Sequence, residues 1–216
     1  MPRRSATDVA GSRAQTLAAA VQLASVVGLE GLTIGRLAEH LGMTKSGLVG
    51  RFGSKEQLQL ATLDQAAAMF RRTVYEPASA ASPGLARLNA ICDAWVAYLA
   101  RPPFTGGCFL TTAMVEFDAR PGPVNEAVRE LMRRWLAVLE REAITAIENG
   151  ELPGEINPKD VAFTINALAV GANCDFQLNR NRASLKRVRR AMAAVLDCRL
   201  QGGDSQPVAG QEHEAK

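Results

Sequence analysis

Two short segments with helical spacing, residues 34–40 and 45–52, constrain the fold of this chain more than any other feature of its sequence. Thr33 and Thr44 directly precede these segments and can cap their first turns, because a threonine hydroxyl accepts a hydrogen bond from a free backbone N–H. Gly42 suits a tight turn between them, since glycine adopts left-handed backbone conformations without strain. Two helices of about two turns around such a turn form a helix-turn-helix, whose second helix can enter the major groove of DNA.

A further helix is expected on each side of this pair. Both begin with a possible capping box, a serine followed three positions later by a glutamine: Ser12 with Gln15, and Ser54 with Gln57. The first helix should run to Val27 and the other to about Tyr75. We therefore expect a flexible basic arm over residues 1–11 and a helix-turn-helix domain over residues 12–57.

The remainder of the chain also has helical periodicity, without strand-like alternation or an internal repeat. Apolar residues recur at helical spacing in segments 85–100, 108–118, 124–149, 158–179 and 183–200. Proline and glycine interrupt this pattern at 76–84 and 101–107, and residues 201–216 have the composition of a disordered tail. The predicted fold class is all-α, with an N-terminal three-helix helix-turn-helix domain and a C-terminal helical domain over residues 58–200.

The net charge of +3 is confined to the first sixty residues, which hold seven basic and four acidic side chains, whereas the rest of the chain is neutral. This excess lowers the electrostatic cost of approaching phosphates, although a solvated basic surface would have the same composition. The content of 47% hydrophobic and 22% charged residues indicates a folded chain. Because there is neither an apolar run of about 18 residues nor a secretory signal, we expect a cytoplasmic protein without a membrane span.

The sequence contains little material for metal or hydrolytic chemistry. The cysteines are too widely spaced for a CxxC motif, and we expect buried free thiols, with a redox-active pair as the alternative. They are Cys92, Cys108, Cys174 and Cys198. With His40 and His213 as the only histidines, neither a His-based zinc site nor a Ser-His-Asp triad is expected. The chain is therefore expected to be no enzyme and to need no metal or cofactor.

The segment Leu32–Glu56, LTIGRLAEHLGMTKSGLVGRFGSKE, resembles the DNA-binding region of TetR/AcrR-family regulators, and the likeness extends over residues 14–60. The resemblance implies that Leu48 and Phe52 hold the second helix of the pair on its core. It also implies a set of DNA contacts: Thr33, Thr44, Lys45, Ser46, Gly47, Arg51 and Lys55. The sequence departs from the family pattern at residues 49–51, where an aromatic residue and a histidine are usual. There Arg51 can contact a phosphate or read a guanine edge.

The resemblance further implies a homodimer on double-stranded operator DNA, formed by helices 158–179 and 183–200, although packing within one chain would give the same pattern. It implies a small-molecule pocket among the central helices, and the sparse charge there favours an apolar or aromatic effector. The candidate lining residues are Trp95, Tyr98, Phe104, Phe109, Met114, Phe117, Trp135 and Asn173. The function so implied is a ligand-released repressor, with an activator or a ligand-independent DNA-binding regulator as the alternative.

Overall fold

The computed structural model describes residues 6–197, with side chains from Arg13 onward, and its secondary structure there is helical. The helices are α1 (Ala6–Val27), α2 (Ile34–Leu41), α3 (Lys45–Phe52), α4 (Lys55–Phe70), α6 (Leu85–Ala100), α7 (Phe109–Phe117), α8 (Pro123–Glu148), α9 (Pro158–Asn179) and α10 (Ala183–Val195). A π-helical turn, η1 (Arg71–Tyr75), and the short α5 (Glu76–Ala78) extend α4. The expected all-α fold is confirmed.

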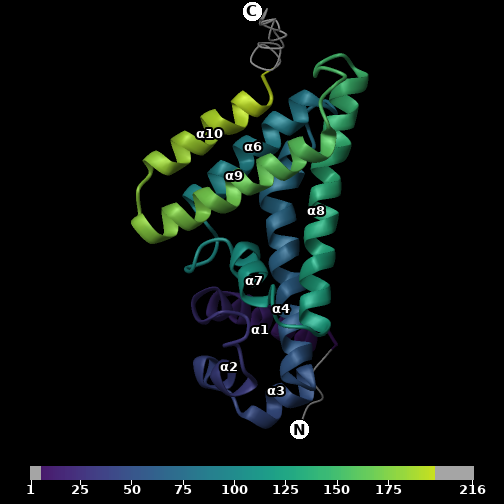
Figure 1. Ribbon diagram of the computed structural model, residues 1–216. Coiled ribbons are helices and arrows are strands. Elements are labelled where there is room, and N and C mark those ends of the chain that lie inside the picture. The colour runs from purple at the N-terminus through teal and green to yellow at the C-terminus, as the bar shows by residue number, and fades with distance from the viewer. Residues whose placement is uncertain (1–5, 198–216) are drawn as a thin grey trace, which may run out of the picture.

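The molecule is elongated, with α1, α2 and α3 forming a head at one end (Figure 1). Helices α4 and α8 run from the head along the body, and α6, α9 and α10 lie across its far end. Helix α7 lies between the head and this far layer, in contact with α1, α4 and α8. Any movement of α7 therefore affects both the head and the body.

Side-chain caps begin α2, α3 and α4 at Thr33, Thr44 and Ser54, as expected from the sequence. Thr33 Oγ1 accepts from Arg36 N at 3.1 Å, and Thr44 Oγ1 accepts from Gly47 N at 3.3 Å. Gly42 ends α2 with a φ of 62°, a left-handed conformation that costs glycine little. The helix-turn-helix expected from these residues is present.

The expected ends of two helices are wrong. Helix α1 begins at Ala6, so Ser12 lies inside it and does not cap it. Residues 6–11 contain no proline, so the helix can extend through half of the expected arm. Helix α10 ends at Val195 instead of residue 200, just before Asp197, whose charge is unfavourable at a helix C-terminus. Residues 1–5 of the expected arm and the expected tail lie outside the described residues.

Because of Pro77, the helix that begins at Lys55 was expected to break at Glu76, but it does not. Instead its turn widens over Arg71–Tyr75, where Glu76 N donates to Arg71 O, five residues back. Proline has no N–H to donate, and its ring clashes with the preceding turn of a regular α-helix. The wide turn relieves this clash, so the helix continues to Ala78.

A cluster of four aromatic rings lies in the core between α4, α6 and α8. The Phe70 ring packs edge-on against Trp95 at 5.6 Å, Tyr98 at 5.4 Å and Trp135 at 4.9 Å between ring centroids. The indoles of Trp95 and Trp135 meet in the same way at 5.0 Å. Such edge-to-face pairs add about 0.5–1.5 kcal/mol each to the stability from burial.

A buried carboxylate joins the start of α6 to α8. Glu142 is 1% exposed, and it accepts from Gly84 N at 3.2 Å and pairs with Arg87 at 3.5 Å. Arg141 contributes a second guanidinium at 3.1 Å. These donors offset the cost of removing the charge from water.

Neither a membrane span nor a metal site is found in residues 6–197. No helix in this range combines the length and apolar character needed to cross a bilayer. The same residues include no group of three or more His, Cys, Asp or Glu side chains that could hold a metal ion.

Candidate functional site

The leading edge of α3 is exposed at the tip of the head. Thr44, Lys45, Ser46 and Gly47 all lie on the surface. Leu48 and Phe52, one turn apart on the opposite face, are buried in the core, and α3 contacts α2 and α4. The local sequence thus produces a short helix with one packed face and one free polar face.

Lys45 lies across the first turn of α2. A Cβ added at Gly35 would lie 3.2 Å from Lys45 Cε and 3.8 Å from Thr33 Oγ1. Glycine at position 35 therefore allows the Lys45 side chain to reach the helix N-terminus that Thr33 caps. Free N–H groups, a hydroxyl and an ammonium group are the donors that phosphate prefers.

Arg51 and Lys55 are only partly exposed, and both contact neighbouring side chains. The Arg51 guanidinium donates to Thr16 Oγ1 at 2.9 Å, which directs it towards α1. Lys55 Nζ pairs with Glu30 Oε1 at 2.5 Å, and this contact lowers the pKa of Glu30. A contact of Arg51 or Lys55 with DNA would therefore compete with an existing hydrogen bond or ion pair.

Two further residues belong to the exposed face of α3, although they were not among the expected DNA contacts. Val49 is 47% exposed, and the position of a Cβ at Gly50 has no neighbour within 4 Å. They lie four residues after Lys45 and Ser46, so helical spacing was the signal that identified them. This face therefore presents Val49, an aliphatic side chain, where the family pattern has an aromatic residue.

Three side chains of the body hold the connection between α1 and α2. Glu116 of α7 accepts from Leu29 N at 2.6 Å and from Glu30 N at 3.1 Å. Gln59 of α4 donates to Leu29 O at 2.7 Å, and Lys55 pairs with Glu30. We call this set of contacts the clasp, because it fixes the head to α4 and α7.

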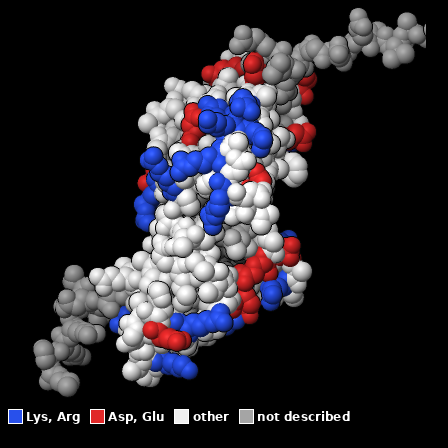
Figure 2. Space-filling model, turned by 90° about the vertical axis from the view of Figure 1, so that its left-hand side faces the viewer, with Lys and Arg blue, Asp and Glu red and all other residues white. Residues whose placement is uncertain are grey.

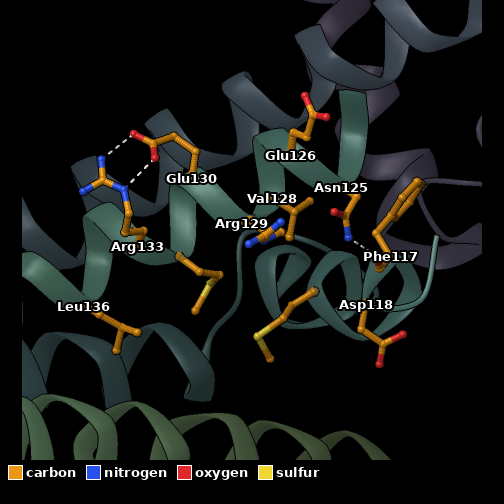
Figure 3. A pocket seen from close by; sticks show the side chains of 11 residues that line it. Phe117, Asp118, Asn125, Glu126, Val128, Arg129, Glu130, Arg133 and Leu136 are labelled. Atoms are coloured by element: carbon orange, nitrogen blue, oxygen red, sulfur yellow. Dashed lines mark hydrogen bonds and ion pairs between the residues drawn. The ribbon is translucent and has the colours of Figure 1, made fainter. Parts of the chain in front are cut away.

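An open groove of 760 Å³ lies between α7 and α8 (Figure 3). Its lining residues are Met114, Phe117, Asp118, Asn125, Glu126, Val128, Arg129, Glu130, Met132, Arg133 and Leu136. Glu130 and Arg133 pair with each other at 2.7 Å, and Asp118, Glu126 and Arg129 are further charged residues of this wall. The groove meets the volume typical of small-molecule sites.

A second, smaller and less open cavity of 30 Å³ lies beside the aromatic cluster. Its lining residues are Phe70, Trp95, Cys108, Leu110, Thr111, Met114, Leu131, Met132, Trp135, Asn166 and Val170. We call it the inner cavity. Met114 and Met132 line both the groove and the inner cavity, so their side chains separate the two spaces.

Of the eight residues expected around an effector, three line the inner cavity, one lines the groove and four are buried in the core. Trp95, Met114 and Trp135 line the inner cavity, and Phe117 lines the groove beside Met114. Tyr98 packs behind Phe70, and burial raises its pKa.

The other three residues are core. Phe104 and Phe109 pack on each other at 6.0 Å between centroids, and both are buried. Asn173 Oδ1 accepts from Cys108 N at 3.2 Å, just before α7 begins. Its amide oxygen is therefore used within the fold.

Phe70, Met132 and Asn166 were not among the expected lining residues. Phe70 lies in the helix expected to run to about Tyr75, and Asn166 lies in a helix expected at the dimer interface. Which face of each helix borders the cavity depends on contacts between distant helices, and the sequence pattern does not specify these contacts.

The described cysteines are free thiols, but they are not all buried. Cys92 and Cys108 are buried, and burial raises the pKa of Cys92 to about 12. Cys174 is exposed, which corrects the expectation of buried thiols. Cys198 lies outside the described residues.

Helices α9 and α10 form an exposed hairpin with an apolar groove of 470 Å³ between them. Phe163, at its edge, is 68% exposed, and Leu178 is 83% exposed. On the side of the molecule seen in Figure 2, basic side chains gather over the upper half, beside uncharged surface. Exposed apolar surface of this kind indicates an interface.

Comparisons with known proteins agree on one family. The model "Bacterial regulatory proteins, tetR family" matches residues 17–62, and "Tetracyclin repressor-like, C-terminal domain" matches residues 84–192. A TetR transcriptional regulator from Chloroflexus aurantiacus is 27% identical, with a TM-score of 0.80 over 86% of this chain and 93% of its own. Among curated proteins there is no significant match.

Two more distant structures share the fold. A TetR-family transcriptional regulator from Streptomyces coelicolor is 23% identical, with a TM-score of 0.73 over 87% of this chain and 95% of its own. AibR, in complex with isovaleryl coenzyme A and operator DNA, is 19% identical, with a TM-score of 0.65 over 83% of this chain and 95% of its own.

Proposed function

Because the chain belongs to the TetR family of transcriptional regulators, we propose that it is a repressor that binds palindromic operator DNA as a homodimer and is released by a small molecule. The family and the fold make it a DNA-binding regulator. The observation that carries the proposal furthest is the exposed edge of α3, with its packed opposite face.

In this proposal α3 enters the major groove. Ser46 and Val49 face the bases, where Val49 can contact a thymine methyl group. Thr33 and Lys45, at the first turn of α2, bind a backbone phosphate. Gly50 leaves space for close approach of the helix to DNA.

One α3 covers only a few base pairs, so useful specificity requires a second copy about 34–36 Å along the DNA. The exposed hairpin of α9 and α10 supports dimerisation through these helices. Phe163 and the groove beside it would be buried against the partner.

The clasp supports a route from effector to DNA. Met114 of α7 borders both cavities, and Glu116, two residues later, holds Leu29 and Glu30 of the head. An effector that displaces α7 shifts the position of the head relative to its partner copy. Two states that differ in head spacing would differ in operator affinity, as ligand-induced release requires.

Selection of bound DNA from a random pool, followed by a titration of the selected site, tests the proposal. We expect a palindrome whose half-sites are one helical turn apart, or a multiple of that, centre to centre. Lys45→Ala should weaken binding at all sequences, whereas Lys159→Ala, an exposed lysine of α9, should not. Sequence-blind binding would contradict the operator proposal, and expression of nearby genes in a deletion strain separates repression from activation.

A further inference from the structure

Two residues that line the inner cavity carry buried polar atoms without hydrogen-bond partners. In the described part of the chain, the buried side-chain nitrogen and oxygen atoms without a partner are Tyr98 Oη, Trp135 Nε1 and Asn166 Oδ1. Trp135 and Asn166 both line the inner cavity, from α8 and α9. Tyr98 lies next to this wall, against Phe70 and close to Cys108. Buried polar groups normally have partners, so an unpaired donor and an unpaired acceptor on one cavity indicate a ligand that satisfies both.

The charge of the lining restricts the ligand. None of the residues that line the inner cavity is Asp, Glu, Lys or Arg. A carboxylate or an ammonium group would lose its hydration there without gaining a charged partner, which is costly. The ligand group inside is therefore uncharged, and the rings of Phe70, Trp95 and Trp135 favour an aromatic body.

Building on the proposed function, we infer that the effector is a small uncharged aromatic compound with a hydroxyl group, bound in the inner cavity between Trp135 and Asn166. A hydroxyl is both donor and acceptor. It accepts from the Trp135 indole N–H and donates to the Asn166 amide oxygen, so that one group satisfies both unpaired atoms.

One route of entry leads from the groove past two methionines. At 30 Å³ the inner cavity has space for a water molecule but not for an aromatic ring. Met114 and Met132 separate it from the groove of 760 Å³. Methionine is unbranched and flexible, so rotation of these side chains can join the two spaces without breaking a hydrogen bond.

The chain contains a specific reporter of this cavity. It has two tryptophans, Trp95 and Trp135, and both line the inner cavity. Intrinsic indole fluorescence therefore responds to this site, and each tryptophan can be replaced while the other still reports.

Three neutral probes of similar shape separate the roles of the hydroxyl. p-Cresol donates and accepts, 4-methylanisole only accepts, and p-xylene does neither. In fluorescence titrations of the unaltered protein we expect p-cresol to bind about tenfold more tightly than p-xylene, with 4-methylanisole between them. 4-Methylbenzoate, an anion, should bind most weakly.

Matched variants identify the two atoms. Trp135→Phe should weaken p-cresol and 4-methylanisole by about fivefold each, because both accept from the indole. Trp95→Phe is the control, since it makes the same change on the same cavity but retains the Trp135 N–H. Asn166→Leu should weaken p-cresol alone.

The outcomes distinguish this inference from the proposed function. Equal binding of p-cresol and p-xylene, or tighter binding of 4-methylbenzoate, overturns the hydroxyl inference, and so does a lack of response to all four probes. None of these results affects operator binding by α3. If p-cresol binds as expected but does not release operator DNA, the cavity binds this class of compound but is not the effector site, and the effector inference fails while operator binding by α3 stands.

Discussion

Replacing Glu116 by alanine should disconnect the effector cavity from the DNA-binding head. Its carboxylate accepts from Leu29 N at 2.6 Å and from Glu30 N at 3.1 Å. Hydrogen bonds to a charged group contribute about 1.5–3 kcal/mol each when they are well shielded. Because Glu116 is partly exposed, water can replace part of the stabilisation from these two hydrogen bonds. We therefore expect Glu116→Ala to lower the free energy of unfolding by about 2 kcal/mol in total.

The effect on coupling should be larger than the effect on binding. Coupling free energies of about 1–3 kcal/mol change affinity by roughly 5–150-fold. Without the clasp to Glu116, p-cresol should bind the free protein with unchanged affinity, because Glu116 does not line the inner cavity. In this variant, the factor by which p-cresol lowers operator affinity should fall to less than about threefold. Fluorescence titration measures the first quantity, and anisotropy of labelled operator DNA with and without p-cresol measures the second.

A matched control and a second route to the same defect make the test decisive. Glu126→Ala removes an exposed carboxylate from the groove and should leave coupling intact. Gly28→Ala would place a Cβ 2.5 Å from Glu116 Oε1 at a residue whose φ is +80°, so it should displace the carboxylate and uncouple the sites as well. If Glu116→Ala retains full effector-induced release, the coupling route through α7 is refuted.

Four further perturbations have defined outcomes. Glu142→Gln should lower stability by about 3 kcal/mol in urea denaturation, because it leaves the Arg87 guanidinium without a buried anion. Gly50→Ala should raise stability by about 0.5–1 kcal/mol, since helix propensity improves and the site is open, yet weaken operator binding in a titration. Phe163→Asp should give monomers in sedimentation analysis. Stabilisation by Glu30, whose pKa is lowered, should be present at neutral pH and lost as the pH falls through that pKa; Glu30→Gln should remove this part of the acid dependence of unfolding.

Local chemistry made the head predictable from the sequence. Thr33 and Thr44 cap their helices as expected, and Gly42 has the left-handed turn conformation. These features depend on residues within one turn of each other, so their spacing in the sequence defines them. The long helices α8 and α9 also agree with their apolar periodicity to within two residues.

Interactions between distant segments could not be predicted in this way. Nothing near Glu116 in the sequence indicates that it holds Leu29, because these residues are 87 positions apart. Asn166 lies on a helix with apolar residues on several faces, so the pattern did not show which face borders a cavity. The π turn before Pro77 arises because the fold keeps the helix continuous where the local sequence favours a break.

Chemical protection of a selected operator tests most directly whether α3 enters the major groove. Dimethyl sulfate methylates guanine N7 in the major groove and adenine N3 in the minor groove. We expect bound protein to protect guanine N7 in two patches about 10 base pairs apart, or a multiple of that, centre to centre, and to leave adenine N3 between them reactive. Protection of adenine N3 alone, or a single unpaired patch, would contradict binding of a dimer through two copies of α3.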